Sequence, residues 1–379
     1  MKTYIVGGAV RDILLGKDPK DIDFCVVGST PDKMIKKGFK PIAASSFPVF
    51  HDDEGQEYAL ARTERKVGDG YHGFECDFDD TITLEEDLFR RDLTMNSMAV
   101  HIKDWETFKI TKDVAFLIDP YDGLKSIEDK KIKHTSKHFD EDPLRALRAV
   151  RLANRYDFSI CKSTKKLIVE LAMSGDLDHL TPERIWLEIE KVFKQSNNIA
   201  DFFNQCAELG ITENIFPTFN SEELFIDYND LKAYNASAID SDEYAFVAMM
   251  NTNSLFYVEK FCEHLKLPSR YFRVFKAYIT IENHFYNEPS DPASIIQCLI
   301  DLNAYRDFKN ITKVINFFIF VEKRYEKECY LLRNCFHITN NVNFESLTEK
   351  QQNTLKGKEI GEAIKNLKIG VVKEFIGEE

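Results

Sequence analysis

The chain has 379 residues, which exceeds the usual size of one hydrophobic core and predicts two to four modules. Hydrophobic residues make up 44% and charged residues 30%, which excludes a disordered or fibrous protein and is typical of a globular one. The formal net charge of −13 argues against a general nucleic-acid binder, whose surface is usually basic.

No apolar run approaches the ~20 residues needed to cross a bilayer, so no membrane contact is expected. The N-terminal MKTYIVGG enters a strand pattern at once and lacks the features of a signal peptide, which predicts a cytoplasmic protein. Eight cysteines are scattered without a CxxC or metal-ligand spacing, so we expect reduced and mostly buried thiols.

The first part of the chain mixes predicted strands and helices. TYIVGGAV reads as a strand and turn, and DIDFCVV and EYALART read as strands. Thr30 followed by Pro31 predicts a helix start, with Thr30 as the N-cap. We therefore expect an α/β module with a mixed sheet and flanking helices over residues 1–139.

From about residue 140 the apolar spacing becomes helical, as in LRALRAVRLANRY and RIWLEIEKVF. We expect three all-α segments, over residues 140–198, 199–300 and 301–379. Residues 200–259 contain eleven Asp or Glu and hold much of the negative charge.

Asp21 and Asp23 are separated by one residue in a predicted strand. Because side chains alternate along a strand, both carboxylates would point the same way, ~6 to 7 Å apart. Two such carboxylates facing a cleft suit Mg²⁺ and phosphoryl or nucleotidyl transfer. An ordinary surface turn can carry the same pair, so the motif alone leaves both interpretations open.

Gly7 and Gly8 stand where a predicted strand ends and a helix begins. Backbone amides at such a helix start can hold a triphosphate, and Arg11 can add a charge-assisted hydrogen bond. A simple strand-to-helix turn is the alternative interpretation.

One acid and four arginines recur every three or four residues over a predicted helix: Asp142, Arg145, Arg148, Arg151 and Arg155. This spacing places them on one face. A solvated amphipathic face is the alternative. The choice of arginine at every basic position favours recognition of phosphates and base edges, because the guanidinium donates in a planar fork.

The combination of GGAVRD and DID resembles the head of the DNA polymerase β nucleotidyltransferase superfamily. Within it, the chain is most similar to the class II CCA-adding enzymes of enterobacterial type and to bacterial poly(A) polymerases. The further matching segments follow the order of that family: ARTERKVGDGYHGF (61–74), EEDLFRRDLTMNSMA (85–99), DPYDGL (119–124), EDPLRALRAVRLANRY (141–156) and HLTPERIWLEIEK (179–191).

The resemblance implies a template-independent enzyme that adds C, C and A to the 3′ end of tRNA from CTP and ATP and releases pyrophosphate. It implies two Mg²⁺ ions held by Asp21 and Asp23. Residues 1–139 would be the nucleotidyltransferase head, 140–198 the neck, 199–300 the body and 301–379 the tail. The tail would contact tRNA, whose acceptor end and elbow are the expected partners. We favour a monomer.

The resemblance also implies roles for single residues. Glu57 lines up with a third catalytic carboxylate, although a solvent-facing strand Glu is the alternative. Asp142 and Arg145 would pair with the Watson–Crick edge of the incoming base. The ion-paired cap of a helix is the alternative for Arg91 and Asp92. The expected nucleotide-binding residues are Gly8, Arg11, Arg91, Asp92, Asn96, Asp142, Arg145 and Arg148.

Outside the nucleotide site, the family pattern RxxxExxK is present as Arg184, Glu188 and Lys191. At spacings of four and three residues these side chains can form a salt-bridged ladder that supports the neck.

Two regions depart from the pattern of the family. Enterobacterial relatives often carry a His-Asp phosphohydrolase motif, where this chain has Met250-Asn251, so we expect no phosphohydrolase activity. His264, His284 and His337 are expected to be ordinary surface or helix residues. Residues 105–124 are longer than in enterobacterial relatives, near the family's flexible loop, which leaves completeness of CCA addition open.

The C-terminal LKGKEIGEAIKNLKIG resembles the closing segment of the family. It predicts a local basic patch for tRNA made by Lys356, Lys358, Lys365 and Lys368.

Other functions remain as alternatives. A poly(A) polymerase, or an enzyme that adds only CC or only A, would share the same head. A small-molecule nucleotidyltransferase would share Asp21 and Asp23 but would not need the arginine helix. A non-enzymatic tRNA-binding or RNA-chaperone protein would not need the intact acidic pair.

Overall fold

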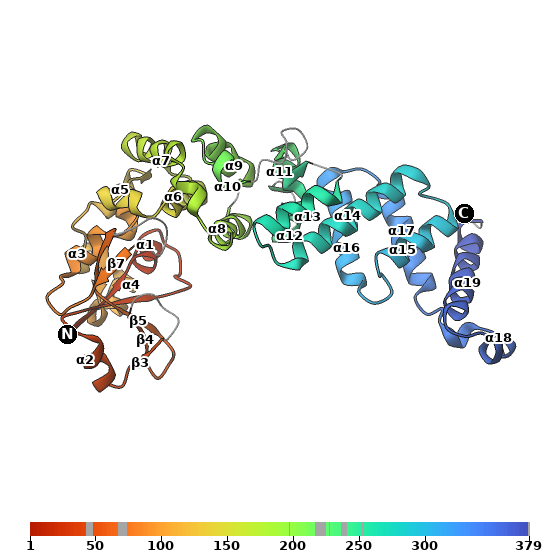
Figure 1. Cartoon of the computed structure of the whole chain (residues 1–379), viewed down its shortest axis with the longest axis horizontal. Helices are drawn as coiled ribbons and strands as arrows, with labels where there is room; N and C mark the ends of the chain where they lie inside the picture. Colours follow the sequence, from red (N-terminus) through yellow and green to blue (C-terminus); the bar gives the residue numbers. More distant parts are fainter. Residues whose placement is uncertain are drawn as a thin grey trace. The chain divides into compact units, whose positions relative to one another are not determined.

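The computed structural model describes residues 1–42, 48–66, 74–196, 198–216, 225–226, 228–235, 241–251 and 254–377. The chain divides into two compact units (Figure 1). The first contains Met1–Glu188 and Asp201–Phe216, and the second contains Ile189–Ala200 and Pro217–Glu379. This division is coarser than the four expected segments, whose boundaries stay a prediction.

A seven-stranded mixed sheet forms the base of the first unit, in the order β3-β4-β5-β2-β1-β8-β9. Strands β2 and β5 pair in parallel, and the other neighbours are antiparallel. This confirms the expected α/β head. The strands are β1 (Lys2–Val6), β2 (Asp23–Val27), β3 (Lys40–Pro41), β4 (Val49–His51), β5 (Glu57–Leu60), β8 (Ala99–His101) and β9 (Leu117–Ile118).

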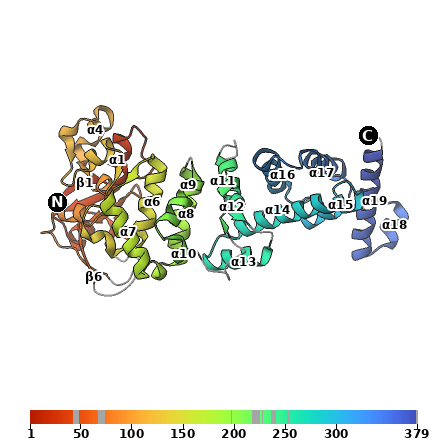
Figure 2. The same cartoon turned by 90° about the horizontal axis from the view of Figure 1, so that it is seen from above.

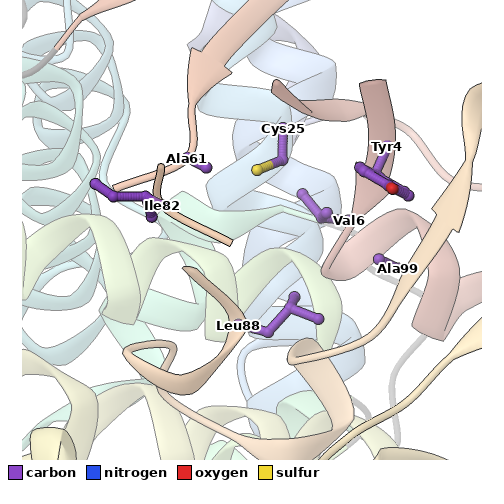
Figure 3. Close-up of a cluster of buried hydrophobic side chains, with 7 residues drawn as sticks. All are labelled: Tyr4, Val6, Cys25, Ala61, Ile82, Leu88 and Ala99. Carbon is purple, nitrogen blue, oxygen red and sulfur yellow. The ribbon is translucent and has the colours of Figure 1, made fainter. Parts of the chain in front are cut away.

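A cluster of buried side chains packs against one part of this sheet. Figure 3 shows the cluster, which joins strands β1, β2 and β8 to helix α3 (Leu84–Phe89). Apolar burial of this kind is the main favourable term in folding and fixes the strands that carry the candidate site. Its members are Tyr4, Val6, Cys25, Ala61, Ile82, Leu88 and Ala99.

The helices of the head begin at the signals expected from the sequence. Helix α1 (Gly8–Leu14) follows Gly7, whose φ of 72° is a conformation that favours glycine. Helix α2 (Pro31–Lys36) has Thr30 as its N-cap, and the Thr30 side chain accepts a hydrogen bond from the Lys33 amide. The remaining elements here are the hairpin β6 (Thr63–Lys66) and β7 (Phe74–Asp77), and the helices α4 (Trp105–Thr111) and α5 (Gly123–Glu128).

After the head, the described secondary structure is mostly helical, as expected. The first unit continues with α6 (Leu144–Tyr156), α7 (Lys162–Ser174), the start of α8 (Pro182–Gln195), α9 (Ile199–Glu208) and α10 (Thr212–Ile215). Short strands β10 (Lys131–Ile132) and β11 (Ser159–Ile160) pair in parallel and tie the start of α7 to the head. Helix α6 lies between these two strands in the sequence, so their pairing fixes where it begins and ends.

The second unit is helical over the residues that the structure describes, apart from the short pair β12 (Phe225–Ile226) and β13 (Met250–Asn251). In Figures 1 and 2, α16 and α17 run alongside α14 and α15, and α19 packs on α15 and α17. The helices are α11 (Tyr228–Asn235), α12 (Asp242–Met249), α13 (Leu255–His264), α14 (Ser269–Asn287), α15 (Pro292–Asp301), α16 (Phe308–Phe317), α17 (Glu326–Thr339), α18 (Glu349–Thr354) and α19 (Lys358–Gly377).

One expectation about the tail is wrong. Lys368 is only 6% exposed, so it cannot belong to a basic surface patch. Its Nζ donates a 2.6 Å hydrogen bond to the Thr339 carbonyl and lies 3.4 Å from the centre of the Tyr305 ring. The cause is helix periodicity, because Lys368 lies one turn before Val372 on the buried face of α19. Lys356 and Lys358 are exposed.

Other expectations concern thiols, histidines and membranes. Seven of the cysteines whose side chains the structure describes are free thiols, and six of these seven are buried. The three histidines of the second unit, His264, His284 and His337, lie in helices α13, α14 and α17. A search of the described residues finds no helix with the length and apolar character needed to span a membrane.

Candidate active site

The turn between β1 and α1 brings the two glycines to the end of the sheet that carries Asp23. In the antiparallel pairing of β1 and β2, Val6 lies opposite Asp23, so Gly7 and Gly8 follow at the same sheet end. A Cβ atom built on Gly7 would lie 3.0 Å from Arg91 Nη1. The backbone at residue 7 therefore lies so close to Arg91 that only glycine fits there without a shift of its neighbours.

Asp23 opens strand β2, whereas Asp21 lies two residues before the strand. The expectation that Asp21 is a strand residue is therefore wrong. The reason is that β1 ends opposite Asp23 and turns away through Gly7, which leaves Asp21 without a partner strand. The two carboxylates nevertheless interact, because the charge of Asp21 contributes to raising the pKa of Asp23.

Asp23 is exposed, but it lies in a concave part of the surface. The pKa of its carboxyl is raised above the usual value mainly because surrounding protein atoms desolvate it. The guanidinium of Arg91 acts in the opposite direction, and the charges of Asp21 and Glu57 raise the pKa further. A carboxylate in this environment gains from a bound cation.

A cavity of about 490 Å³ lies over this region. Its lining includes the acidic residues Asp23 and Glu57 and the basic residues Arg90 and Arg91. Acidic and basic groups on one cavity suit a ligand that brings both metal ions and phosphates. The lining residues are Val6, Asp23, Phe24, Cys25, Ile42, Val49, Glu57, Ala59, Arg62, Asp87, Arg90 and Arg91.

The donor chemistry of this cavity fits Mg²⁺, which prefers carboxylate oxygens and shares its shell with phosphates. Among the residues that the structure describes, however, no three His, Cys, Asp or Glu side chains lie close enough together to hold a metal ion. Glu57 is largely exposed and its Oε1 lies 3.5 Å from His51 Nε2. The metal assignment therefore depends on the pair Asp21 and Asp23, and the role of Glu57 stays a prediction.

Arg90 and Arg91 are held by the buried carboxylate of Asp87. Arg90 Nη2 donates to Asp87 Oδ1 at 2.6 Å, and Arg91 Nη2 donates to Asp87 Oδ2 at 3.0 Å. Burial alone would raise the pKa of Asp87, but the two guanidinium groups outweigh it and hold the pKa well below its usual range. Asp87 therefore stays ionised and fixes both arginines at the cavity.

Asp92 and Asn96 form the next part of the site. Asn96 Nδ2 donates to Asp92 Oδ1 at 3.1 Å, and Arg148 Nε of helix α6 donates to Asp92 Oδ2 at 3.0 Å. On its other side, Asn96 Oδ1 accepts from Arg11 Nη1 at 2.7 Å. Four of the expected nucleotide-binding residues thus form one continuous chain of hydrogen bonds from α1 to α6.

Asp142 lies just before helix α6 and is paired with Arg184 of helix α8. Arg184 Nη2 donates to Asp142 Oδ2 at 2.7 Å, and the Leu144 amide donates to Asp142 Oδ1 at 3.2 Å. Arg145, also expected to read the base, donates through Nη1 to the His138 carbonyl. Both base-reading candidates are therefore held in place by the protein.

The arginine helix is not a solvated face. Arg145 and Arg151 are buried, and Arg148 and Arg155 are half-buried. Arg151 Nε donates to Glu188 Oε2 at 2.6 Å, and Arg148 Nη1 lies 3.6 Å from Glu188 Oε1. Glu188 therefore joins α8 to α6. The expected ladder of Arg184, Glu188 and Lys191 along α8 stays a prediction.

Sequence reasoning missed three polar residues of this region. Asp87 holds Arg90 and Arg91, and Asp12 accepts hydrogen bonds from Arg11 and from the Tyr156 hydroxyl. A usable signal existed for Asp87, which lies three and four residues before the two arginines. No local spacing links Asp12 to Tyr156, because they are 144 residues apart in the chain.

Two known families match residues 3–223 of the chain, apart from a gap between them. The family described as poly A polymerase head domain matches residues 3–133. The family described as probable RNA and SrmB-binding site of polymerase A matches residues 157–223. The first of these covers the sheet, the glycine turn and the carboxylates described above.

Two similar structures share the fold over nearly the whole chain. The Bacillus stearothermophilus CCA-adding enzyme in complex with CTP has a TM-score of 0.65 at 23% identity, over 98% of this chain and 89% of that one. The Thermotoga maritima CCA-adding enzyme complexed with tRNA has a TM-score of 0.61 at 20% identity, over 100% and 91%. At these identities the likeness establishes the fold.

Sequence relatives extend the match. The Marinobacter nauticus CCA-adding enzyme is 47% identical over 230 residues, which cover 59% of this chain and 58% of that protein. The Francisella tularensis subsp. novicida CCA-adding enzyme is 37% identical over an alignment of 391 positions, gaps included. The alignment covers 97% of this chain and 100% of that protein. The chain therefore belongs to the family of CCA-adding enzymes, which are nucleotidyltransferases.

Proposed function

We propose that the chain adds C, C and A to the 3′ end of tRNA from CTP and ATP, with Asp21 and Asp23 as the Mg²⁺ ligands. The observation that carries the site assignment is the register of β1 and β2. It sets Asp23 beside the glycine turn and on the same cavity as Arg91. A metal-binding carboxylate and phosphate-binding groups therefore face one ligand.

In the proposed reaction, the 3′-hydroxyl of tRNA attacks the α-phosphate of the nucleotide and pyrophosphate leaves. Bound Mg²⁺ would lower the pKa of the attacking hydroxyl and stabilise the leaving group. The amides at the start of α1 and the side chains of Arg11 and Arg91 orient the triphosphate. Positioning and charge stabilisation carry most of the rate enhancement in such reactions.

Base choice is assigned to Asp142 and Arg145. A carboxylate accepts from an exocyclic amine, which cytosine and adenine have and uracil lacks, while a guanidinium donates to a ring acceptor. Asp92 and Asn96 are assigned to the ribose, where they would help exclude deoxynucleotides. Arg148 is assigned to nucleotide binding, and its hydrogen bond to Asp92 supports this assignment.

The decisive experiment incubates tRNA that ends at the discriminator base with Mg²⁺ and labelled CTP, with and without ATP. We expect extension by two residues with CTP alone and by three with both nucleotides, read by sequencing the product ends. Runs of A from ATP alone would favour a poly(A) polymerase, and a product that stops after two residues would favour a CC-only enzyme. No extension would contradict the proposal.

We further propose that the enzyme acts in the cytoplasm as a monomer. The expected tRNA contacts are the acceptor end and the elbow. Footprinting of tRNA by the full chain tests the contacts, and sedimentation tests the monomer.

A further inference from the structure

Tyr156, the last residue of helix α6, contacts helix α1 through both its hydroxyl and its ring. The hydroxyl donates a 2.8 Å hydrogen bond to Asp12 Oδ1. The guanidinium carbon of Arg11 lies 5.0 Å from the centre of the Tyr156 ring. The helix assigned to base choice thus touches the arginine assigned to the phosphates.

The same oxygen of Asp12 holds Arg11. Asp12 Oδ1 accepts from Arg11 Nε at 2.9 Å and from Arg11 Nη2 at 2.7 Å, while Arg11 Nη1 donates to Asn96 Oδ1 at 2.7 Å. Arg11 and Asp12 are only 6% and 8% exposed. A guanidinium has five N–H groups, so two remain for a ligand when only the described residues are considered.

The two remaining N–H groups belong to the Nη atoms, which lie at the start of helix α1. A Cβ atom built on Gly8 would be 3.5 Å from Arg11 Nη2. Arg11 is therefore fixed with its two remaining donors beside the glycine turn.

The Tyr156 ring is itself fixed by its surroundings. Lys17 Nζ lies 4.8 Å and the guanidinium carbon of Arg155 lies 5.0 Å from the ring centre, in addition to Arg11. Cations are attracted to the face of an aromatic ring. Burial raises the pKa of Tyr156 to about 12, so the hydroxyl keeps its proton and donates at neutral pH.

We propose that Tyr156 is a positioning residue for the triphosphate of the incoming nucleotide. Its hydroxyl fixes Asp12 and its ring fixes Arg11, so the two remaining Arg11 donors are oriented before the nucleotide arrives. A group that is already oriented loses less entropy on binding. This inference rests on the proposed function, which assigns Arg11 to the phosphates.

The test compares Tyr156→Phe with Tyr121→Phe in the full chain. The first removes the hydroxyl bound to Asp12 and keeps the ring. The second removes a hydroxyl of the same unit that donates to the Glu85 carbonyl at 2.9 Å, and serves as the matched control. Calorimetry measures the dissociation constants of CTP, inorganic triphosphate and cytidine, and tRNA extension gives kcat and KM.

For Tyr156→Phe we expect CTP and inorganic triphosphate to bind about three- to tenfold more weakly, the effect of one lost hydrogen bond. Cytidine binding should be unchanged, and KM should rise while kcat stays within about twofold, because ground-state binding is what is lost. Tyr121→Phe should match the wild type in all three ligands.

Unchanged triphosphate affinity in Tyr156→Phe would overturn the inference, whatever its thermal stability. Equal weakening of cytidine binding, or the same loss in Tyr121→Phe, would also overturn it, since each indicates a general structural effect. Extension of tRNA by the wild type distinguishes a failure of the proposed function from a failure of the role proposed for Tyr156. A wild type that cannot extend tRNA contradicts the proposed function, whereas an active wild type with unaffected Tyr156→Phe removes only the role of Tyr156.

Discussion

The Asp142 carboxylate is bound on both oxygens, by the Arg184 guanidinium at 2.7 Å and by the Leu144 amide at 3.2 Å. Arg184 lies on helix α8 and Asp142 lies just before helix α6. The orientation of a carboxylate assigned to base choice is thus set by a second helix.

We therefore expect Arg184→Met to reduce base discrimination. Losing a charged hydrogen bond should lower the CTP-over-UTP ratio of kcat/KM by about tenfold. Steady-state incorporation of each nucleotide into tRNA measures this ratio. Arg306→Met, an exposed site in the second unit, is the control. An unchanged ratio in Arg184→Met would show that Asp142 does not depend on Arg184.

Replacing either Asp21 or Asp23 by Ala should abolish incorporation while tRNA binding is largely kept, because these carboxylates are assigned to Mg²⁺ and not to tRNA. Asp18→Ala, in the exposed segment just before them, is the matched control and should retain activity. Incorporation assays and gel-shift titrations measure the two properties. Turnover in either Asp21→Ala or Asp23→Ala would rule out the assigned metal site.

Glu188→Ala should destabilise the first unit by about 3–5 kcal/mol, because it leaves the buried Arg151 without the carboxylate that it binds. Glu188→Gln should cost less, since the amide oxygen can still accept a hydrogen bond. Both tryptophans, Trp105 and Trp186, lie in the first unit, so urea denaturation followed by tryptophan fluorescence reports on it. Equal midpoints for the wild type and Glu188→Ala would contradict the pairing.

Lys368 should make the stability of the tail depend on pH. Burial lowers its pKa to about 8, so in alkaline solution the unfolded chain binds the proton more tightly than the folded chain. The unfavourable contribution of charged Lys368 is fully present below about pH 8 and is lost as the pH rises towards the unfolded pKa of about 10.4.

The expected result is that the wild type gains stability relative to Lys368→Met as the pH rises from about 8 to about 10. Thermal unfolding followed by far-ultraviolet circular dichroism measures the difference. Lys358→Met, at an exposed position near the start of the same helix, is the control for replacing a lysine of α19 by methionine. A constant difference for Lys368→Met would mean that folding does not lower the pKa of the amine.

No phosphate should be released from a 2′,3′-cyclic nucleotide, with or without Ni²⁺, because the chain has Met250-Asn251 at the position where the resemblance implies a His-Asp pair. Phosphate release measured with the purified chain tests this. Activity that disappears in His264→Ala or His284→Ala would contradict the prediction.

Local patterns were enough to predict most elements of the head. Short apolar runs marked β1 and β2, Thr30 and Pro31 marked the start of α2, and the paired glycines marked the turn into α1. Each of these signals acts within a few residues of the structure that it determines, so no knowledge of tertiary packing is needed.

The side-chain pairings could not be predicted in the same way. Glu188 has local partners at helical spacing, and yet it binds arginines of α6, because the packing of α8 on α6 offers a buried charge that must be compensated. Asp21 lies outside its predicted strand because β1 ends too early to pair with it. The pairing of Glu188 and the position of Asp21 both depend on another segment of the chain, α6 for Glu188 and β1 for Asp21.

The hydrogen-bonded chain from Tyr156 through Asp12, Arg11, Asn96 and Asp92 to Arg148 has a consequence for redesign of this enzyme. Each member satisfies a neighbour, so a single replacement leaves a buried polar group without its partner. Natural sequences would then be expected to change these positions in pairs. A library that seeks new nucleotide preferences should vary adjacent members together rather than one residue at a time.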